Sequence, residues 1–80
     1  MVKHISPKER KMLQSNIKRI MQTKGVTLRG LAEASGVSKQ TIVTARQDAG
    51  ISECRLSTLA RIARALEVGT KDLFDEKREP

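Results

Sequence analysis

Apolar residues recur along this chain at intervals of three or four, the spacing that places side chains on one face of an α-helix. The first such series runs from Leu13 to Met21 and predicts a helix over residues 7–24. Ser6 and Pro7 have the residue types favoured at an N-cap and at the first helical position. A glycine directly after the series is expected to end this helix.

Two shorter helices are predicted in the middle of the chain, over residues 28–35 and 39–47. Thr27 and Ser38 precede them as candidate N-caps, each able to accept a backbone N–H. Gly36 lies between them and can adopt the left-handed conformation that ends a helix and turns the chain. Two helices joined by so tight a turn predict a helix-turn-helix.

The second of these helices has two distinct faces. Ile42 and Ala45 lie three positions apart and are expected to pack on the preceding helix, where Ala32 permits a close crossing. The opposite face is uncharged but able to form hydrogen bonds, with a lysine at its edge. At 100° per residue that outer face comprises Gln40, Val43, Thr44 and Gln47, with Lys39 beside them.

The C-terminal part predicts a loop over residues 48–55, a helix over 56–66 and a short helix over 70–74. The fold class is therefore all-α, with five helices in one domain over residues 1–74. The remaining residues, 75–80, form a charged tail that is expected to be disordered.

The charge is unevenly distributed. The chain of 80 residues has a formal net charge of +7, and residues 1–40 hold nine Lys and Arg against two acidic residues. Residues 41–80 hold seven of each sign. A polyanion is the natural partner for such a field, although basic charge on composition alone also serves solubility.

The sequence offers little for catalysis. His4 is the only histidine and Cys54 the only cysteine, so neither a metal-ligand cluster nor a nucleophile pair is predicted, and no cofactor is expected. A single cysteine excludes an internal disulfide and favours the cytoplasm. Without a secretory signal or an apolar run of about 18 residues, we expect a protein that is not in a membrane.

The chain resembles the lambda-repressor and Cro-like helix-turn-helix family, also called the XRE family. The resemblance extends over residues 16–74, and its most specific parts are residues 36–42, 59–68 and 72–74. It implies a five-helix, lambda-repressor-like domain that binds double-stranded DNA with the helix at 39–47 in the major groove.

The resemblance also implies which residues contact DNA. Base contacts are expected from Lys39, Gln40 and Thr44, and Val43 on the same outer face suits a thymine methyl or is simply a surface residue. Phosphate contacts are expected at the start of the second helix and at both ends of the third. These candidates are Thr27, Arg29, Ser38, Thr41, Arg46 and Gln47.

Three positions depart from the family pattern. Leu28 stands where many relatives have a glutamine that bridges a phosphate and the recognition helix, and Arg29 beside it is the candidate to compensate. Gly30 replaces a better helix former, at about 1 kcal/mol against the helix. Arg46 replaces a frequent glutamate, so its phosphate contact is argued from its charge.

The predicted function is a small transcriptional regulator, a repressor that occupies a two-fold symmetric operator as a homodimer. No small-molecule ligand is evident. Candidate dimer residues are Ile51, Leu73 and Phe74, which could instead complete the core. Two alternatives remain: an antitoxin that also binds DNA, and a protein-interaction module without DNA binding.

Overall fold

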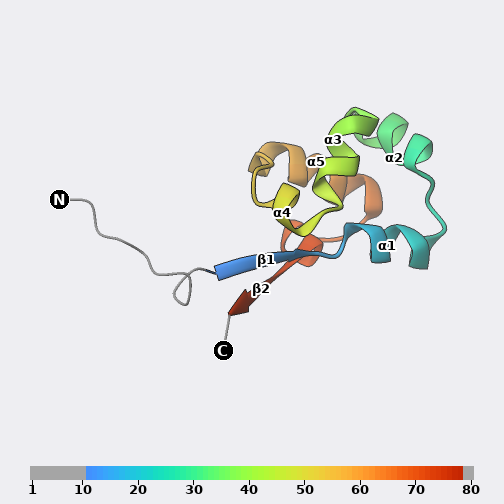
Figure 1. Ribbon diagram of the computed structural model, residues 1–80. Helices are drawn as coiled ribbons and strands as arrows, with labels where there is room; N and C mark the ends of the chain where they lie inside the picture. Colours follow the sequence, from blue (N-terminus) through green and yellow to red (C-terminus); the bar gives the residue numbers. More distant parts are fainter. Residues whose placement is uncertain (1–10, 79–80) are drawn as a thin grey trace.

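The computed structural model describes residues 11–78, in which five α-helices are joined to a small two-stranded sheet (Figure 1). The strands are β1 (Lys11–Ser15) and β2 (Phe74–Arg78). The helices are α1 (Ile17–Lys24), α2 (Leu28–Ser35), α3 (Lys39–Ala45), α4 (Asp48–Ile51) and α5 (Leu56–Leu66), followed by the 3-10 helix η2 (Thr70–Leu73). The predicted helical fold class is confirmed, with a small two-stranded sheet in addition.

The core lies where α1, α2, α3 and α5 meet and is made almost entirely of aliphatic side chains. Seven large side chains there are fully buried: Ile17, Leu31, Ile42, Ile51, Ile62, Leu66 and Leu73. The predicted spans of α2 and α5 agree with the structure at both ends. Each carries apolar residues at helical spacing, and the periodicity of α5 is stronger than those of α1 and α2.

The first predicted helix was wrong over residues 11–15. Residues 11–15 form β1, and α1 begins only at Ile17. The expected start at Ser6 and Pro7 lies outside the described residues. Asn16 explains the change of structure, because its backbone N–H donates to the carbonyl of Leu73 at 2.8 Å. That contact with the far end of the chain diverts the backbone from the helix that local spacing favoured.

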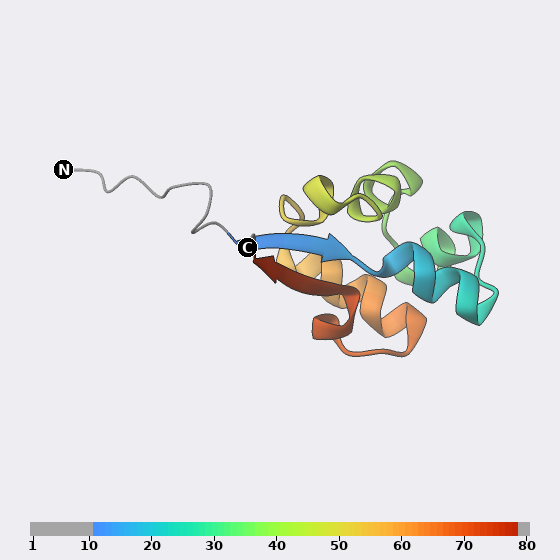
Figure 2. The same cartoon turned by 60° about the horizontal axis from the view of Figure 1, so that its bottom comes forward.

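The expected disordered tail was wrong for residues 75–78, which belong to β2. β1 and β2 pair antiparallel, with Lys11 opposite Arg78 and Ser15 opposite Phe74 (Figure 2). Each strand thereby supplies the backbone partners that the other lacks. The two described ends of the chain therefore lie side by side.

Three boundaries near the C-terminal half also differ from prediction. The expected loop over residues 48–55 contains α4, and α3 ends at Ala45 rather than at Gln47. α5 ends at Leu66 as predicted, and its C-cap Glu67 takes the left-handed conformation (φ 59°). The expected fifth helix is the 3-10 turn η2.

Two of the three candidate dimer residues are core residues instead. Ile51 is 1% exposed and Leu73 is fully buried, while Phe74 is partly buried against the same cluster. α4 and η2 are short, so each fixes its position by burying one large side chain. Neither Ile51 nor Leu73 is therefore available to a second molecule.

Within residues 11–78, no helix is long and apolar enough to cross a membrane. This agrees with a core built from short amphipathic helices, of which α5 is the longest at 11 residues.

Candidate nucleic-acid interface

The turn between α2 and α3 is built from local hydrogen bonds. Gly36 takes φ 72°, and its N–H donates to the carbonyl of Ala32 at 3.0 Å. The N–H of Val37 donates to the Ser35 hydroxyl at 3.1 Å, and the Val37 side chain is buried. The left-handed glycine ends α2, and the buried valine fixes the direction in which α3 leaves.

Thr27 caps α2 as expected. Its Oγ1 accepts a hydrogen bond from the N–H of Gly30 at 3.0 Å. Leu28 packs against the core, so the position where many relatives carry a bridging glutamine is here used for packing. Arg29 next to it is exposed and forms an ion pair with Glu33 at 3.8 Å between Nε and Oε2. Such an exposed pair is weak and leaves the guanidinium accessible to another anion.

Ser38 caps α3 in the same way. Its Oγ accepts the N–H of Thr41 at 3.1 Å and donates to the Thr41 hydroxyl at 2.9 Å. Ile42 and Ala45 are fully buried, which holds the inner face of α3 against the core. The cap and the buried face together fix both the start and the rotation of α3.

The outer face of α3 presents three exposed side chains of different chemistry. Lys39 and Gln40 are exposed, and Val43 is 41% exposed, one of only two large apolar side chains that are exposed in the described chain. An ammonium, an amide and a pair of methyl groups match guanine acceptors, an adenine edge and a thymine methyl. The structure thus brings three of the four expected base-contacting residues onto one surface.

Thr44, the fourth, lies partly inside the protein. Its hydroxyl donates to the Gln40 carbonyl at 3.1 Å, and its side chain is half-buried beside α4. A Cβ added to Gly50 would lie 2.8 Å from Thr44 Cγ2, so the two elements are in close contact there. α4 therefore occupies part of the space that an outward Thr44 would have used.

Arg46 and Gln47 follow α3 rather than belonging to its last turn. Arg46 is the C-cap of α3, and Gln47 has extended backbone before α4. Arg46 is half-buried and Gln47 is exposed. The expected common face of Gln47 with Gln40 was wrong, because that face required the helix to continue through residue 47.

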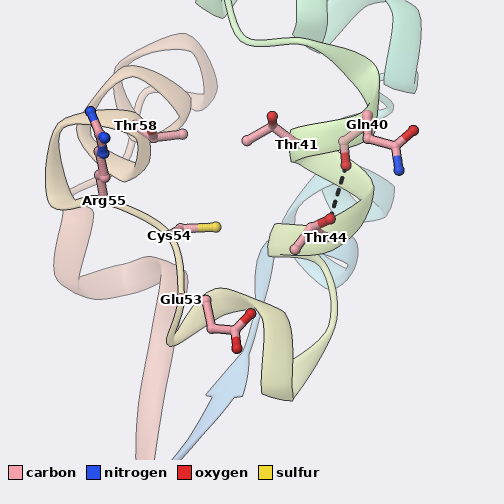
Figure 3. A pocket seen from close by; sticks show the side chains of 7 residues that line it. All are labelled: Gln40, Thr41, Thr44, Glu53, Cys54, Arg55 and Thr58. Carbon is pink, nitrogen blue, oxygen red and sulfur yellow. Dashed lines mark hydrogen bonds between the residues drawn. The ribbon is translucent and has the colours of Figure 1, made fainter.

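A hollow of about 340 Å³ lies between α3 and the segment that joins α4 to α5 (Figure 3). Gln40, Thr41 and Thr44 line it on the α3 side, and the opposite wall is formed by Glu53, Cys54, Arg55 and Thr58. The Thr41 side chain points across it, whereas the Gln40 side chain points away (Figure 3). The sequence analysis missed this second wall, because no local signal in residues 53–58 places them beside α3.

Cys54 contributes a neutral group to this hollow. Burial, and then the nearby carboxylate of Glu53, raise the pKa of the Cys54 thiol above its usual value. Its Sγ donates to the Gly50 carbonyl at 3.5 Å. A thiol held in its protonated form adds no negative charge to the wall and is a poor nucleophile.

The described residues offer no metal centre: among them, no group of three or more His, Cys, Asp or Glu side chains could hold an ion.

The similarity of the chain to known proteins agrees with a DNA-binding domain. A family model described as a Cro/C1-type HTH DNA-binding domain matches residues 16–77. The comparisons with curated proteins and with solved structures found no match.

Proposed function

Because the chain belongs to the Cro/C1-type helix-turn-helix DNA-binding domain family, we propose that it is a cytoplasmic transcriptional regulator that represses by occupying a specific operator. The observation that carries this proposal is the exposed outer face of α3. Lys39, Gln40 and Val43 lie together there, while Ile42 and Ala45 hold the same helix from behind. A supported helix with varied polar chemistry on its free face suits the major groove.

Each exposed residue of α3 has a specific expected contact. Lys39 donates to guanine O6 or N7, Gln40 pairs with the N6 and N7 atoms of adenine, and Val43 contacts a thymine methyl. Thr44 contacts a base from the side of the hollow. Direct base contacts of this kind carry specificity, whereas phosphate contacts fix the register of the protein on the duplex.

Phosphate contacts come from groups around α3. The expected set is Thr27, Arg29, Ser38, Thr41, Arg46 and Gln47, to which the geometry adds Arg55 and Thr58 across the hollow. Thr27 and Ser38 already cap helices through accepted hydrogen bonds. The Thr27 hydroxyl accepts in its cap and still has its proton to donate to a phosphate. The Ser38 hydroxyl donates to the Thr41 hydroxyl, so it would have to turn away from Thr41 to donate to a phosphate.

A single α3 contacts only a few base pairs. Useful affinity and specificity therefore favour a homodimer on a two-fold symmetric operator, with half-sites about one helical turn apart. The dimer surface must lie outside the core positions Ile51 and Leu73.

The decisive experiment is selection of bound sites from a pool of random duplexes, followed by affinity measurements at several salt concentrations. We expect an enriched, two-fold symmetric sequence and a steep loss of affinity with salt, because several phosphates are contacted. Failure to enrich any sequence, together with a flat salt dependence, would refute the proposal and favour a protein-interaction module.

Variants of α3 then test the individual roles. Gln40→Ala and Lys39→Gln should each lower discrimination at one base-pair position by roughly 1 to 3 kcal/mol. Lys71→Gln is the matched control, because it removes the same charge from an exposed position in η2. A uniform loss of affinity across all sequences would instead identify Lys39 as a phosphate contact.

A further inference from the structure

Glu53 is an acidic residue on a surface otherwise suited to a polyanion. It is exposed, and it is the only acidic residue that lines the hollow beside α3 in the described chain. Its side chain lies at the α4 end of the hollow, below Cys54 and Thr44 in the view (Figure 3). Within residues 11–78 it has no ion-pair partner, although Arg55 lies in the same wall.

The position of Glu53 is not explained by a structural role of its side chain. The loop is held by the backbone, where the N–H of Glu53 donates to the Gly50 carbonyl at 3.1 Å. The side chain adds no hydrogen bond to this turn in the described chain and is open to solvent. Replacement of the carboxylate should therefore leave the fold intact.

A carboxylate at a DNA interface interacts unfavourably with phosphates and favourably with hydrogen-bond donors on base edges. Close to a phosphate it is repelled, and this repulsion acts on every duplex. Close to an exocyclic amino group at a base edge it accepts a hydrogen bond, and cytosine N4 is the usual donor to Glu. A non-cognate complex held only by phosphates retains the repulsion and lacks the compensating donor.

We propose that Glu53 is a specificity-determining residue, which weakens binding to non-cognate duplexes and accepts a hydrogen bond from a cytosine amino group in the cognate complex. This inference rests on the proposed function. Glu53 and Lys39 would then act at different positions. The lysine selects by attraction to guanine acceptors, and the carboxylate selects by repelling the phosphates that the arginines bind on every duplex.

Glu53→Gln tests the charge. Gln keeps an acceptor oxygen but removes the repulsion, so affinity for a scrambled duplex should rise about fivefold at low salt, as expected for one unit-charge contact near 4 Å in water. The gain should shrink as salt rises, because exposed charges are screened. Glu67→Gln is the matched control at the opposite end of α5. It should change neither the affinity for the scrambled duplex nor the affinity for the operator.

Glu53→Ala tests the acceptor. It should raise affinity for the scrambled duplex as Glu53→Gln does, and in addition lower discrimination at one C·G pair of the selected operator by about tenfold, within the range for one base contact. Equal melting temperatures of wild type and variants would show that folding is unchanged.

The outcomes separate this inference from the function on which it rests. A wild-type protein that prefers no duplex overturns both. A wild type that selects an operator, with Glu53→Gln and Glu53→Ala shifting operator and scrambled affinities by one common factor or not at all, overturns the role of Glu53 alone.

Discussion

The helix-turn-helix and the part of the molecule around the sheet are held together in opposite ways. In α2 and α3 the stabilising polar contacts are local: Thr27 bonds Gly30, and Ser38 bonds Thr41, each three residues apart. Around β1 they are distant. Asn16 bonds Asp72 and Asp75, which lie 56 and 59 residues away in the chain.

α4 belongs to the second kind of region. The N–H of Ser15 donates to Asp48 at 2.9 Å, and the Ser15 hydroxyl donates to the Ala45 carbonyl at 2.6 Å. β1 thus reaches the point where α3 ends and α4 begins. α3 therefore starts by local rules but ends where a distant strand meets it.

The largest effect is expected where α4 approaches α3. In Gly50→Ala the new Cβ would collide with the carbonyl oxygen of Thr44 and lie 2.9 Å from its carbonyl carbon, so we expect a loss of about 3 kcal/mol in unfolding free energy. Denaturant unfolding measures it. Gly30→Ala is the control: its Cβ meets only the Thr27 hydroxyl, at 3.1 Å, and stability should stay within about 1 kcal/mol of wild type. Equal losses in the two variants would contradict the close contact.

A smaller effect is expected at the junction of β1 and α1. Asn16→Ala removes donors to the Asp72 carbonyl (3.3 Å) and to Asp75 Oδ2 (3.0 Å) from a residue that is 5% exposed. We expect a loss of about 2 kcal/mol, because the variant loses a hydrogen bond to a carboxylate and a second one to a backbone carbonyl. Hydrogen exchange should show the loss of protection in β1 and β2 before α2 and α3. Gln14→Ala, in the neighbouring strand β1, serves as the control. An equal loss of protection in the strands and in α2 and α3 would argue against a difference between the two regions.

The smallest effect is expected at the local cap of α3. Ser38→Ala removes the oxygen that accepts the N–H of Thr41 at 3.1 Å and should lower stability by about 1 kcal/mol. Ser57→Ala is the comparison, since Ser57 is exposed in the first turn of α5 and is not its N-cap. If thermal unfolding showed that Ser38→Ala lowers stability more than Asn16→Ala does, the local cap would contribute more than the distant contacts, contrary to this comparison.

Prediction from sequence succeeded where a few neighbouring residues decide the structure. Gly36 was expected in the left-handed conformation and has it, and Thr27 and Ser38 cap as expected. The outer face of α3 followed from the helical repeat for Lys39, Gln40 and Val43. The prediction failed at Gln47, because the end of α3 depends on tertiary contacts. Ser15 bonds the carbonyl of Ala45 and the side chain of Asp48, and Gly50 of α4 packs against Thr44.

The second wall of the hollow shows the same limit. Glu53, Arg55 and Thr58 are adjacent to α3 only because α4 folds back and buries Ile51. Their residue types gave no reason to place them beside Thr41 and Thr44. Predicting that a segment is a loop does not predict its direction in space, so the sequence does not indicate which helix the loop will face.

The sequence by itself determined the family, the positions of α2, α3 and α5, and the side chains that α3 turns outward, because caps and apolar periodicity act within a few residues. Only the tertiary structure decided that residues 11–15 and 74–78 pair as strands, that Ile51 and Leu73 are core, and that Glu53 lines the same hollow as α3. Strand pairing and close packing are stabilised by partners far away in the chain, and a local pattern carries no information about which distant segment will be that partner.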